Sequence, residues 1–277
     1  MASEKIVREM YNGQFEVTHN PFAKGSQPRY VVENLQTGEV TKPKGVTTIL
    51  GATLAKDLVS WAVGMAKDYL TAKHPEISIQ DIEDACKQYT IRRDKGADTG
   101  SEAHAMVENF LKGYPTPPVG EHSEEAENAF LAFKKWFDDV GAEVINVEEV
   151  IFSPTFGYCG TYDCMLRING KIYLCDLKTT NASRRAPKGV YPEMFIQLGA
   201  YAAAHHEQRA TELLFGKGTE LLQIDGLMVI SARKDGKLDV VTNEAVLLSV
   251  DECEEAFKQV VNIYKFLTNT TKELGGK

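Results

Sequence analysis

An Asn-Gly dipeptide at residues 169–170, between two β-prone runs, constrains the fold of this chain more than any other feature. The flanking runs, residues 161–168 and 171–177, are rich in β-branched and aromatic side chains. Asn-Gly between two such runs is the strongest short-range signal for a β-hairpin, because both residues tolerate the backbone of a type I′ turn. We therefore expect two adjacent antiparallel strands that meet at this turn.

The second strand of this hairpin carries charged residues next to an apolar run. Asp176 directly follows residues 172–175, and Lys178 lies two positions further on. Side chains alternate along a strand, so Asp176 and Lys178 point to the same face. Pairing across the turn places Asp163 of the first strand near Asp176. Because Asp and Lys are rarely buried unless they are paired or bind a metal, we expect two carboxylates and an ammonium on one face.

Such a cluster suits phosphodiester hydrolysis. Carboxylate oxygens are hard ligands that hold Mg²⁺ or Mn²⁺. An ion of this kind polarises a phosphate, lowers the pKa of bound water and neutralises charge in the transition state. Lys178 would position or help to deprotonate the attacking water, or stabilise the developing charge. The alternative interpretation is a structural salt bridge within the sheet.

The remaining chain predicts helices and strands in an order typical of an α/β layer with a mixed sheet. A β-hairpin at residues 15–17 and 30–32 precedes a helical pattern around Trp61, which His74-Pro75 ends. Residues 1–88 are expected to form a hairpin and helical extension packed on a core of residues 89–277, as one compact unit. The expected core helices span about residues 89–111, 123–141, 192–206 and 249–267, and the further strands residues 144–152, 222–232 and 238–242.

The charge balance opposes nucleic-acid binding unless the charge is unevenly distributed. The chain has 31 Lys and Arg against 39 Asp and Glu, a net charge of −8 at pH 7, whereas binding to a phosphate backbone relies on basic residues. If two basic groups face one cleft, a local positive surface survives this deficit. The groups are Arg92, Arg93 and Lys95, and Lys178 with Arg184, Arg185 and Lys188. The last three are the expected DNA contacts.

Cysteine spacing and hydropathy indicate a cytoplasmic protein. Five cysteines without a C-x-x-C pair argue against a disulfide framework or a zinc site. Cys159, Cys164 and Cys175 lie in strand-like runs and are expected to be buried thiols. No apolar run approaches the ~20 residues of a membrane span, and residues 1–10 lack the apolar stretch of a secretory signal. The expected compartment is the cytoplasm of a bacterial or phage-infected cell, without membrane contact.

Two tetrapeptides around the hairpin resemble a nuclease signature. Gly160-Thr161-Tyr162-Asp163 followed by Asp176-Leu177-Lys178-Thr179 resembles the PD-(D/E)xK motif, in the form found in RecB-like exonucleases. Further parts of that pattern stand in the same order, and the resemblance covers roughly residues 30–201. These parts are residues 46–50 with Trp61, similar to the lead-in of phage-encoded and mitochondrial-genome-maintenance exonucleases, residues 95–104 ending at His104, Glu148, and Gln197-x-x-x-Tyr201.

The resemblance implies a restriction-endonuclease-like core, in which a central mixed β-sheet is flanked by helices. It assigns catalysis to Asp163, Asp176, Lys178, Gln197 and Tyr201. It assigns metal binding to His104, Glu148, Asp163, Asp176 and the backbone carbonyl of Leu177. The Gln-x-x-x-Tyr pair shares one helical face and would orient the lysine or hold a DNA phosphate.

Several of these residues also have a plainer interpretation. His104 and Glu108 share a helical face, but His104 alone is typical of a hydrogen-bonded core histidine, and Glu108 of a surface charge. The Gln-x-x-x-Tyr pair alone is typical of a half-buried helix face. Glu148 and Glu149 alternate along a strand, so only one of them faces the site, and the resemblance favours Glu148.

These observations predict a Mg²⁺- or Mn²⁺-dependent deoxyribonuclease, expected to be an exonuclease on DNA ends or single strands in replication, recombination or repair. An endonuclease on the same fold and an inactive nucleic-acid-binding protein are the alternatives. The iron–sulfur cluster of some RecB-like relatives is not expected, since only Cys253 follows Cys175 where that plan needs three cysteines. A helicase P-loop is absent too, so duplex unwinding would need a partner. Candidate partners are a helicase, a recombinase or a single-strand-binding protein.

Overall fold

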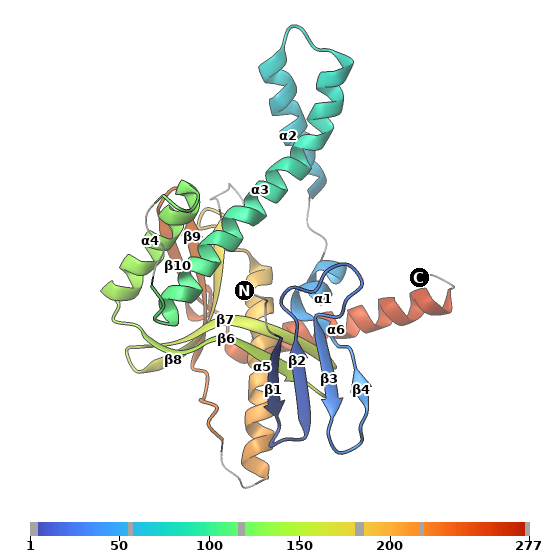
Figure 1. The fold of residues 1–277 in the computed structure, drawn as a ribbon, viewed down its shortest axis with the longest axis vertical. Coiled ribbons are helices and arrows are strands. Elements are labelled where there is room, and N and C mark those ends of the chain that lie inside the picture. The colour runs from blue at the N-terminus through green and yellow to red at the C-terminus, as the bar shows by residue number, and fades with distance from the viewer. Residues whose placement is uncertain (1–4, 55–57, 116–119, 181–185, 216–218, 275–277) are drawn as a thin grey trace.

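A mixed β-sheet forms the centre of the protein (Figure 1). The computed structural model describes residues 5–54, 58–115, 120–180, 186–215 and 219–274. Within these residues the sheet has six strands, five of them in the order β10-β9-β8-β7-β5, with β6 paired to β7. The β8–β9 and β5–β7 pairs are parallel, and the others are antiparallel. The strands span Lys44–Gly45 (β5), Glu143–Ser153 (β6), Tyr158–Ile168 (β7), Lys171–Thr180 (β8), Gly226–Arg233 (β9) and Leu238–Thr242 (β10).

Strand β7 has one continuous edge and one divided edge. Strand β6 pairs along nearly the whole of the first edge. Strands β5 and β8 therefore share the second edge, β5 beside Tyr158 and Cys159 and β8 beside residues 164–168. Between these two partners, residues 160–163 form no ladder on this edge within the described chain. The first Asp of the predicted hairpin thus lies in a gap of the sheet.

Helices cover both faces of the sheet (Figure 1). The alternation along β8 follows from its sequence: Leu174 packs in the core beneath one helical layer, whereas Cys175 packs beneath the other. Asp176 shares the face of Leu174. The first layer consists of α1 (Val46–Thr53), α5 (Pro192–Leu214) and α6 (Val250–Glu273), and the second of α3 (Ile79–Leu111) and α4 (Glu124–Asp139).

The N-terminal residues form a separate antiparallel sheet that packs against β6 and β7. A shared cluster of buried side chains, among them Val17, Val32 and Phe152, holds it there. The Tyr11 hydroxyl donates to the Phe152 carbonyl at 2.8 Å, and the Tyr30 and Thr161 hydroxyl oxygens are 3.1 Å apart. This N-terminal sheet runs in the order β1 (Ile6–Met10), β2 (Phe15–His19), β3 (Tyr30–Asn34) and β4 (Val40–Thr41).

A helical hairpin of α2 (Leu58–Lys73) and α3 projects from the rest of the molecule (Figure 1). Helix α3 begins about ten residues before the predicted start at residue 89. A capping box explains the difference: Ser78 Oγ accepts a hydrogen bond from the Asp81 amide, and the Asp81 carboxylate accepts one from the Ser78 amide. The predicted start at residue 89 is therefore wrong, although this start signal is local in the sequence.

The structure confirms the predicted fold class: a mixed α/β fold with a helix-flanked central sheet, consistent with a restriction-endonuclease-like core. The Asn169-Gly170 turn and the capping box at Ser249 are also confirmed. The predicted N-terminal hairpin is confirmed as part of a four-stranded antiparallel sheet. Three further predicted bounds are wrong: α5 continues to Leu214, β9 begins at Gly226 rather than at residue 222, and α6 ends at Glu273 rather than near residue 267. No helix among the described residues is both long and apolar enough to cross a membrane.

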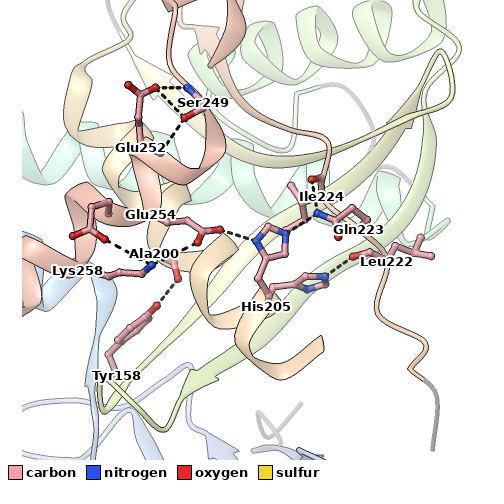
Figure 2. Close-up of polar contacts among 12 residues, drawn as sticks. Tyr158, Ala200, His205, Leu222, Gln223, Ile224, Ser249, Glu252, Glu254 and Lys258 are labelled. Carbon is pink, nitrogen blue, oxygen red and sulfur yellow. Dashed lines mark hydrogen bonds and ion pairs between the residues drawn. The ribbon is translucent and has the colours of Figure 1, made fainter. Parts of the chain in front are cut away.

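Helix α5 lies unusually close to α6. A Cβ atom at Gly199 would stand 2.2 Å from the Cys253 carbonyl oxygen and 2.8 Å from the Glu254 amide nitrogen. Only glycine leaves room for this backbone approach. The Tyr158 hydroxyl of β7 donates to the Ala200 carbonyl at 2.7 Å, which ties α5 to the sheet at the same level (Figure 2).

Polar contacts hold the following turns of α5 (Figure 2). His206 Nδ1 lies 2.7 Å from Glu254 Oε1 on α6, and His205 Nε2 lies 2.7 Å from the Leu222 carbonyl oxygen. Together with the glycine contact, these interactions fix the height and rotation of α5. Gln197 and Tyr201 on this helix are thereby held toward the centre of the sheet.

Substitution of Gly199 by Ala tests this close approach. The added methyl group has no free volume, so the helices must separate, and we expect a loss of about 1–3 kcal/mol in the free energy of unfolding, measured by denaturant titration. Gly64→Ala in α2 is the control. Nothing lies within 4 Å of its Cβ position, so that change should stabilise the protein by roughly 0.5–1 kcal/mol through helix propensity. Equal stability of the Gly199→Ala variant and the parent protein would contradict the packing.

Candidate active site

Three carboxylates occupy neighbouring positions on three adjacent strands. The β7–β8 ladder ends at Cys164↔Cys175, and one further step along this register places Asp163 beside Asp176. On the other edge of β7, the β6–β7 register places Glu148 opposite Asp163, although these two residues are not themselves paired. We call Glu148, Asp163 and Asp176 the carboxylate row. Its members come from β6, β7 and β8, at the level where the β7 edge divides.

Asp163 lies at the point where β8 separates from β7. Its Oδ2 atom accepts a hydrogen bond of 2.6 Å from the Leu177 amide, so a side chain replaces a bond of the interrupted ladder. On α3, His104 Nδ1 lies 3.9 Å from Asp163 Oδ1. The predicted approach of the His104 helix to the site is therefore present. Leu177 contacts Asp163 through its amide, and the role of its carbonyl as a metal ligand stays a prediction.

Asp176 is almost fully buried, with 1% of its surface exposed. Lys178 Nζ donates to Asp176 Oδ1 at 2.8 Å and lies 2.6 Å from Oδ2. Gln197 Nε2 donates to Asp176 Oδ1 and to the Tyr201 hydroxyl, each at 2.9 Å. No hydrogen bond of acceptable angle reaches the buried Oδ2 within the described residues. The contact between Lys178 and Gln197 is thus indirect, through the carboxylate that both groups hold.

Glycine at position 160 has a steric role in this arrangement. A Cβ atom there would stand 2.7 Å from Tyr201 Cε1 and 3.1 Å from Val46 Cγ2. The Tyr201 ring therefore packs directly over the β7 backbone, which any larger residue would prevent. This contact explains why a glycine precedes the Thr-Tyr-Asp segment.

Burial and nearby negative charge oppose ionisation of Glu148 and Asp176. Burial raises the pKa of Asp176 to about 6, although the neighbouring Lys178 acts in the opposite direction. Burial and the Asp163 charge raise the pKa of Glu148 to about 8. Burial alone would lower the pKa of Lys178, but Asp176 and Asp163 outweigh it and the pKa is raised. The site therefore holds more carboxylates than its own ammonium neutralises.

The donor set fits a hard divalent cation in its chemistry. Carboxylate oxygens are the ligands that Mg²⁺ and Mn²⁺ prefer, and a cation would favour the charged form of Glu148 against burial and the repulsion by Asp163. Asp176 Oδ2 faces the Lys178 ammonium at 2.6 Å but accepts no well-directed hydrogen bond from a described residue. Within the described ranges, no three His, Cys, Asp or Glu side chains converge closely enough to hold one ion as they stand. Binding a cation thus requires carboxylates to turn away from Lys178 and the Leu177 amide.

The row opens into a cleft of about 320 Å³ between the central sheet and the N-terminal sheet. Asp163, Asp176 and Glu148 line it from one side, together with Lys178, Gln197 and Tyr201. Glu149 lies outside the cleft and pairs with Arg8 at 3.3 Å, so Glu148 is the member of this pair that faces the site. Glu108 lies one helical turn after His104 and pairs with Lys112.

The opposite wall of the cleft was not foreseen. It includes His19, Arg29 and Tyr30 of the N-terminal sheet and the threonines at positions 47 and 48. The two threonines belong to the lead-in segment that the resemblance singled out, without a stated role. No spacing or motif in the sequence points to His19 or Arg29, because only the docking of the N-terminal sheet brings them to the cleft.

The basic groups expected near the site are only partly there. Lys178 lines the cleft, and Lys188 is exposed in the turn that follows β8, whereas Arg184 and Arg185 lie outside the described residues. The condition that both basic groups face one cleft is not met, because the α3 group lies outside the cleft lining. Arg93 pairs with Asp94 at 2.8 Å and Lys95 with Glu125 at 3.7 Å, and neither they nor Arg92 line the cleft.

The predicted thiols behave as small hydrophobic residues. Cys159, Cys164 and Cys175 are each at most 2% exposed, and all five cysteines are free. Burial raises the pKa of Cys253 to about 11, which keeps it protonated at neutral pH.

Comparison with known proteins finds a likeness to solved structures but no related sequence. No protein-family model and no curated protein matches the chain. The crystal structure of an alkaline exonuclease (LHK-Exo) from Laribacter hongkongensis is similar, with 14% sequence identity and a TM-score of 0.24, over 63% of this chain and 86% of that chain. The function proposed below rests on the geometry of the site.

The raised pKa of Glu148 predicts a pH-dependent stability of the metal-free protein. In the unfolded chain Glu148 loses its proton near its ordinary pKa of 4.5, whereas in the folded chain it keeps the proton up to about pH 8. The stability of the folded protein therefore falls as the pH rises from 4.5 to 8. Glu148→Gln removes the charge and should flatten that fall. In chelator, we expect its melting temperature to match the parent near pH 4.5 and to exceed it by a few degrees at pH 8.

The control for this prediction is Glu149→Gln, because this neighbour lies outside the cleft. It should leave the pH dependence of the melting temperature unchanged. If the melting temperatures of the Glu148→Gln variant and the parent protein run parallel from pH 4.5 to 8, Glu148 is not a buried carboxylate repelled by its neighbours.

Proposed function

We propose that this protein is a metal-dependent deoxyribonuclease that hydrolyses phosphodiester bonds at the carboxylate row. The observation that carries the proposal is the arrangement of Glu148, Asp163 and Asp176 on three adjacent strands, with Lys178 bound to the innermost carboxylate, at the side of a cleft. Surplus carboxylates with a raised pKa, in a cleft beside one ammonium, are the donor set expected of such a site. A structural salt bridge would need neither the third carboxylate nor the cleft.

Asp163, Asp176 and Glu148 would hold Mg²⁺ or Mn²⁺, and His104 and the Leu177 carbonyl are proposed as further ligands. When bound, the ion supplies Lewis acidity toward the phosphodiester and its attacking water. No iron–sulfur cluster is part of this proposal. The hard oxygen donors and the single imidazole are compatible with either divalent ion.

Lys178 is proposed to stabilise negative charge on the phosphate during hydrolysis. Its raised pKa keeps it protonated at neutral pH, so it donates hydrogen bonds rather than accepting a proton. The charge-stabilising role is thus favoured over that of a general base. Gln197 and Tyr201 act as positioning residues: Gln197 donates to both Asp176 and Tyr201 and so fixes the rotamer of the carboxylate.

Exonuclease action is the finer part of the proposal. The cleft lies between two sheets, with the N-terminal sheet over one side, which favours a strand end or a single strand over a continuous duplex. Comparison of a linear with a covalently closed circular substrate tests this directly. Cleavage of the closed circle would favour an endonuclease, and binding without any cleavage would favour an inactive DNA-binding protein.

We place the proposed activity in the cytoplasm, in DNA replication, recombination or repair. Arg184, Arg185 and Lys188 are proposed as DNA contacts from their position after the catalytic strand. A helicase, recombinase or single-strand-binding protein would supply the duplex opening for which the chain has no P-loop of its own.

The row itself is tested by Asp163→Asn, Asp176→Asn and Lys178→Met. Either aspartate change should lower cleavage of single-stranded DNA by on the order of 10³-fold and abolish the rise in melting temperature that saturating Mn²⁺ causes. Lys178→Met should lower the rate by on the order of 10²-fold and keep the thermal shift by Mn²⁺. Glu143→Gln, at the exposed start of β6, is the control. Full activity of Asp176→Asn would overturn the assignment.

His104→Ala separates a metal ligand from a structural histidine. A neutral imidazole favours Mn²⁺ over Mg²⁺, so its loss should narrow the difference between the two ions in cleavage and in thermal stabilisation, and should lower the rate at low metal concentration. His122→Ala, outside the cleft, is the matched control. A His104→Ala protein with a lower melting temperature and unchanged metal dependence would exclude His104 from the site.

A further inference from the structure

A buried histidine with two unused ring nitrogens lies in the wall of the cleft opposite the carboxylate row. His19 is 4% exposed, and neither Nδ1 nor Nε2 has a hydrogen-bond partner within the described residues. Buried polar groups almost always have a partner, so these two nitrogens are available for hydrogen bonds with a ligand. The ring stacks on Tyr30, with centroids 4.8 Å apart and planes 14° from parallel.

The same wall carries an unneutralised cation. Arg29 on the loop before β3 is exposed, lines the cleft, and makes no ion pair with any described residue; its guanidinium donates only to the Pro21 carbonyl, at 3.3 Å. Burial raises the pKa of Glu148, and the Arg29 charge acts in the opposite direction with a smaller effect. Lys178, the other full cation in the lining, is already neutralised by Asp176. Arg29 is therefore the free positive charge that an anion in this cleft would meet.

The wall is held rigidly in place. His19 and Tyr30 are directly opposed on β2 and β3, and the Tyr30 hydroxyl lies 3.1 Å from the Thr161 hydroxyl, two residues before Asp163. Burial, reinforced by Arg29, lowers the pKa of His19 to about 4, so the imidazole is neutral at physiological pH. A neutral ring donates one hydrogen bond and accepts another.

We infer that Arg29 and His19 form a phosphate-binding site for the nucleic acid, separate from the carboxylate row. Arg29 binds the phosphate oxygens as a charged, potentially bidentate donor, and His19 donates one further hydrogen bond. The inference rests on the proposed function, since it names how the substrate of that site is held. A strand bound there has one phosphate on the N-terminal sheet while another faces the row across the cleft.

Binding of a short single-stranded oligothymidylate in chelator tests this inference without catalysis. Arg29→Gln should weaken binding by about three- to tenfold at low salt and reduce the slope of log K against log salt by about 0.7, the value for one phosphate contact on a single strand. His19→Phe keeps the stacked ring but removes both nitrogens. It should weaken binding about threefold with the slope unchanged, since a single neutral hydrogen bond is lost and no charge is removed. Arg8→Gln, on the same sheet but outside the cleft, is the control.

Two forms of the oligonucleotide, with a 5′-phosphate and with a 5′-hydroxyl, identify the phosphate. If Arg29→Gln loses the same affinity for both forms, the bound group is an internal phosphodiester. If it loses affinity only for the phosphorylated form, the bound group is the terminal phosphate. An Arg29→Gln variant that binds DNA with the affinity and salt slope of the parent protein overturns the inference. If the parent protein cleaves DNA, the proposed function then stays intact. Conversely, an Arg29-dependent slope in a protein that cuts no DNA supports the phosphate site and refutes the nuclease. Melting temperatures of both variants verify that each is folded.

Discussion

The burial of the Asp176 carboxylate is the constraint on which the rest of the structure depends. A carboxylate that is 1% exposed has lost its hydration, and the loss is large unless charges and hydrogen bonds replace water. Lys178 supplies a compensating charge and Gln197 supplies a hydrogen bond, and Tyr201 orients the Gln197 amide. The close packing of α5 on α6 at Gly199 then holds Gln197 at the required distance. Fold stability far from the site and polar geometry within it are therefore coupled through one helix.

The divided edge of β7 turns this polar cluster into an accessible one. If β8 followed β7 along its whole length, Asp163 would face a complete ladder and the cleft would be closed by strand pairing. Instead β5 pairs with the edge of β7 near Cys159. The Asp163 carboxylate accepts a hydrogen bond from the Leu177 amide, which the β7–β8 ladder leaves unpaired. The unpaired residues between these partners line the cleft, together with the N-terminal sheet. An interruption of regular hydrogen bonding is thus what gives the carboxylates room to bind a ligand.

Local charge reconciles the acidic composition of the chain with the polyanionic substrate proposed for it. The α3 cations are neutralised by neighbouring acids or lie away from the cleft, so this group adds little attraction to a phosphate backbone. Within the cleft the balance differs, because the proposed divalent cation at the row and the free charge of Arg29 would both attract phosphate. Binding at this site depends on a few placed charges rather than on the net charge.

What the sequence determined by itself is local. Turn chemistry predicted the hairpin at Asn169-Gly170, and strand alternation put Asp176 and Lys178 on one face, because both effects act between residues close in the chain. The capping box that starts α3 is equally local, so the start of this helix is also determined by the sequence. The tertiary structure alone decided the remainder: the left-handed backbone of Glu148, with φ of 54°, the approach of α5 to α6, and the wall that carries His19 and Arg29. These features join segments more than a hundred residues apart or depend on how sheets and helices dock, and such contacts leave no period or spacing in the sequence.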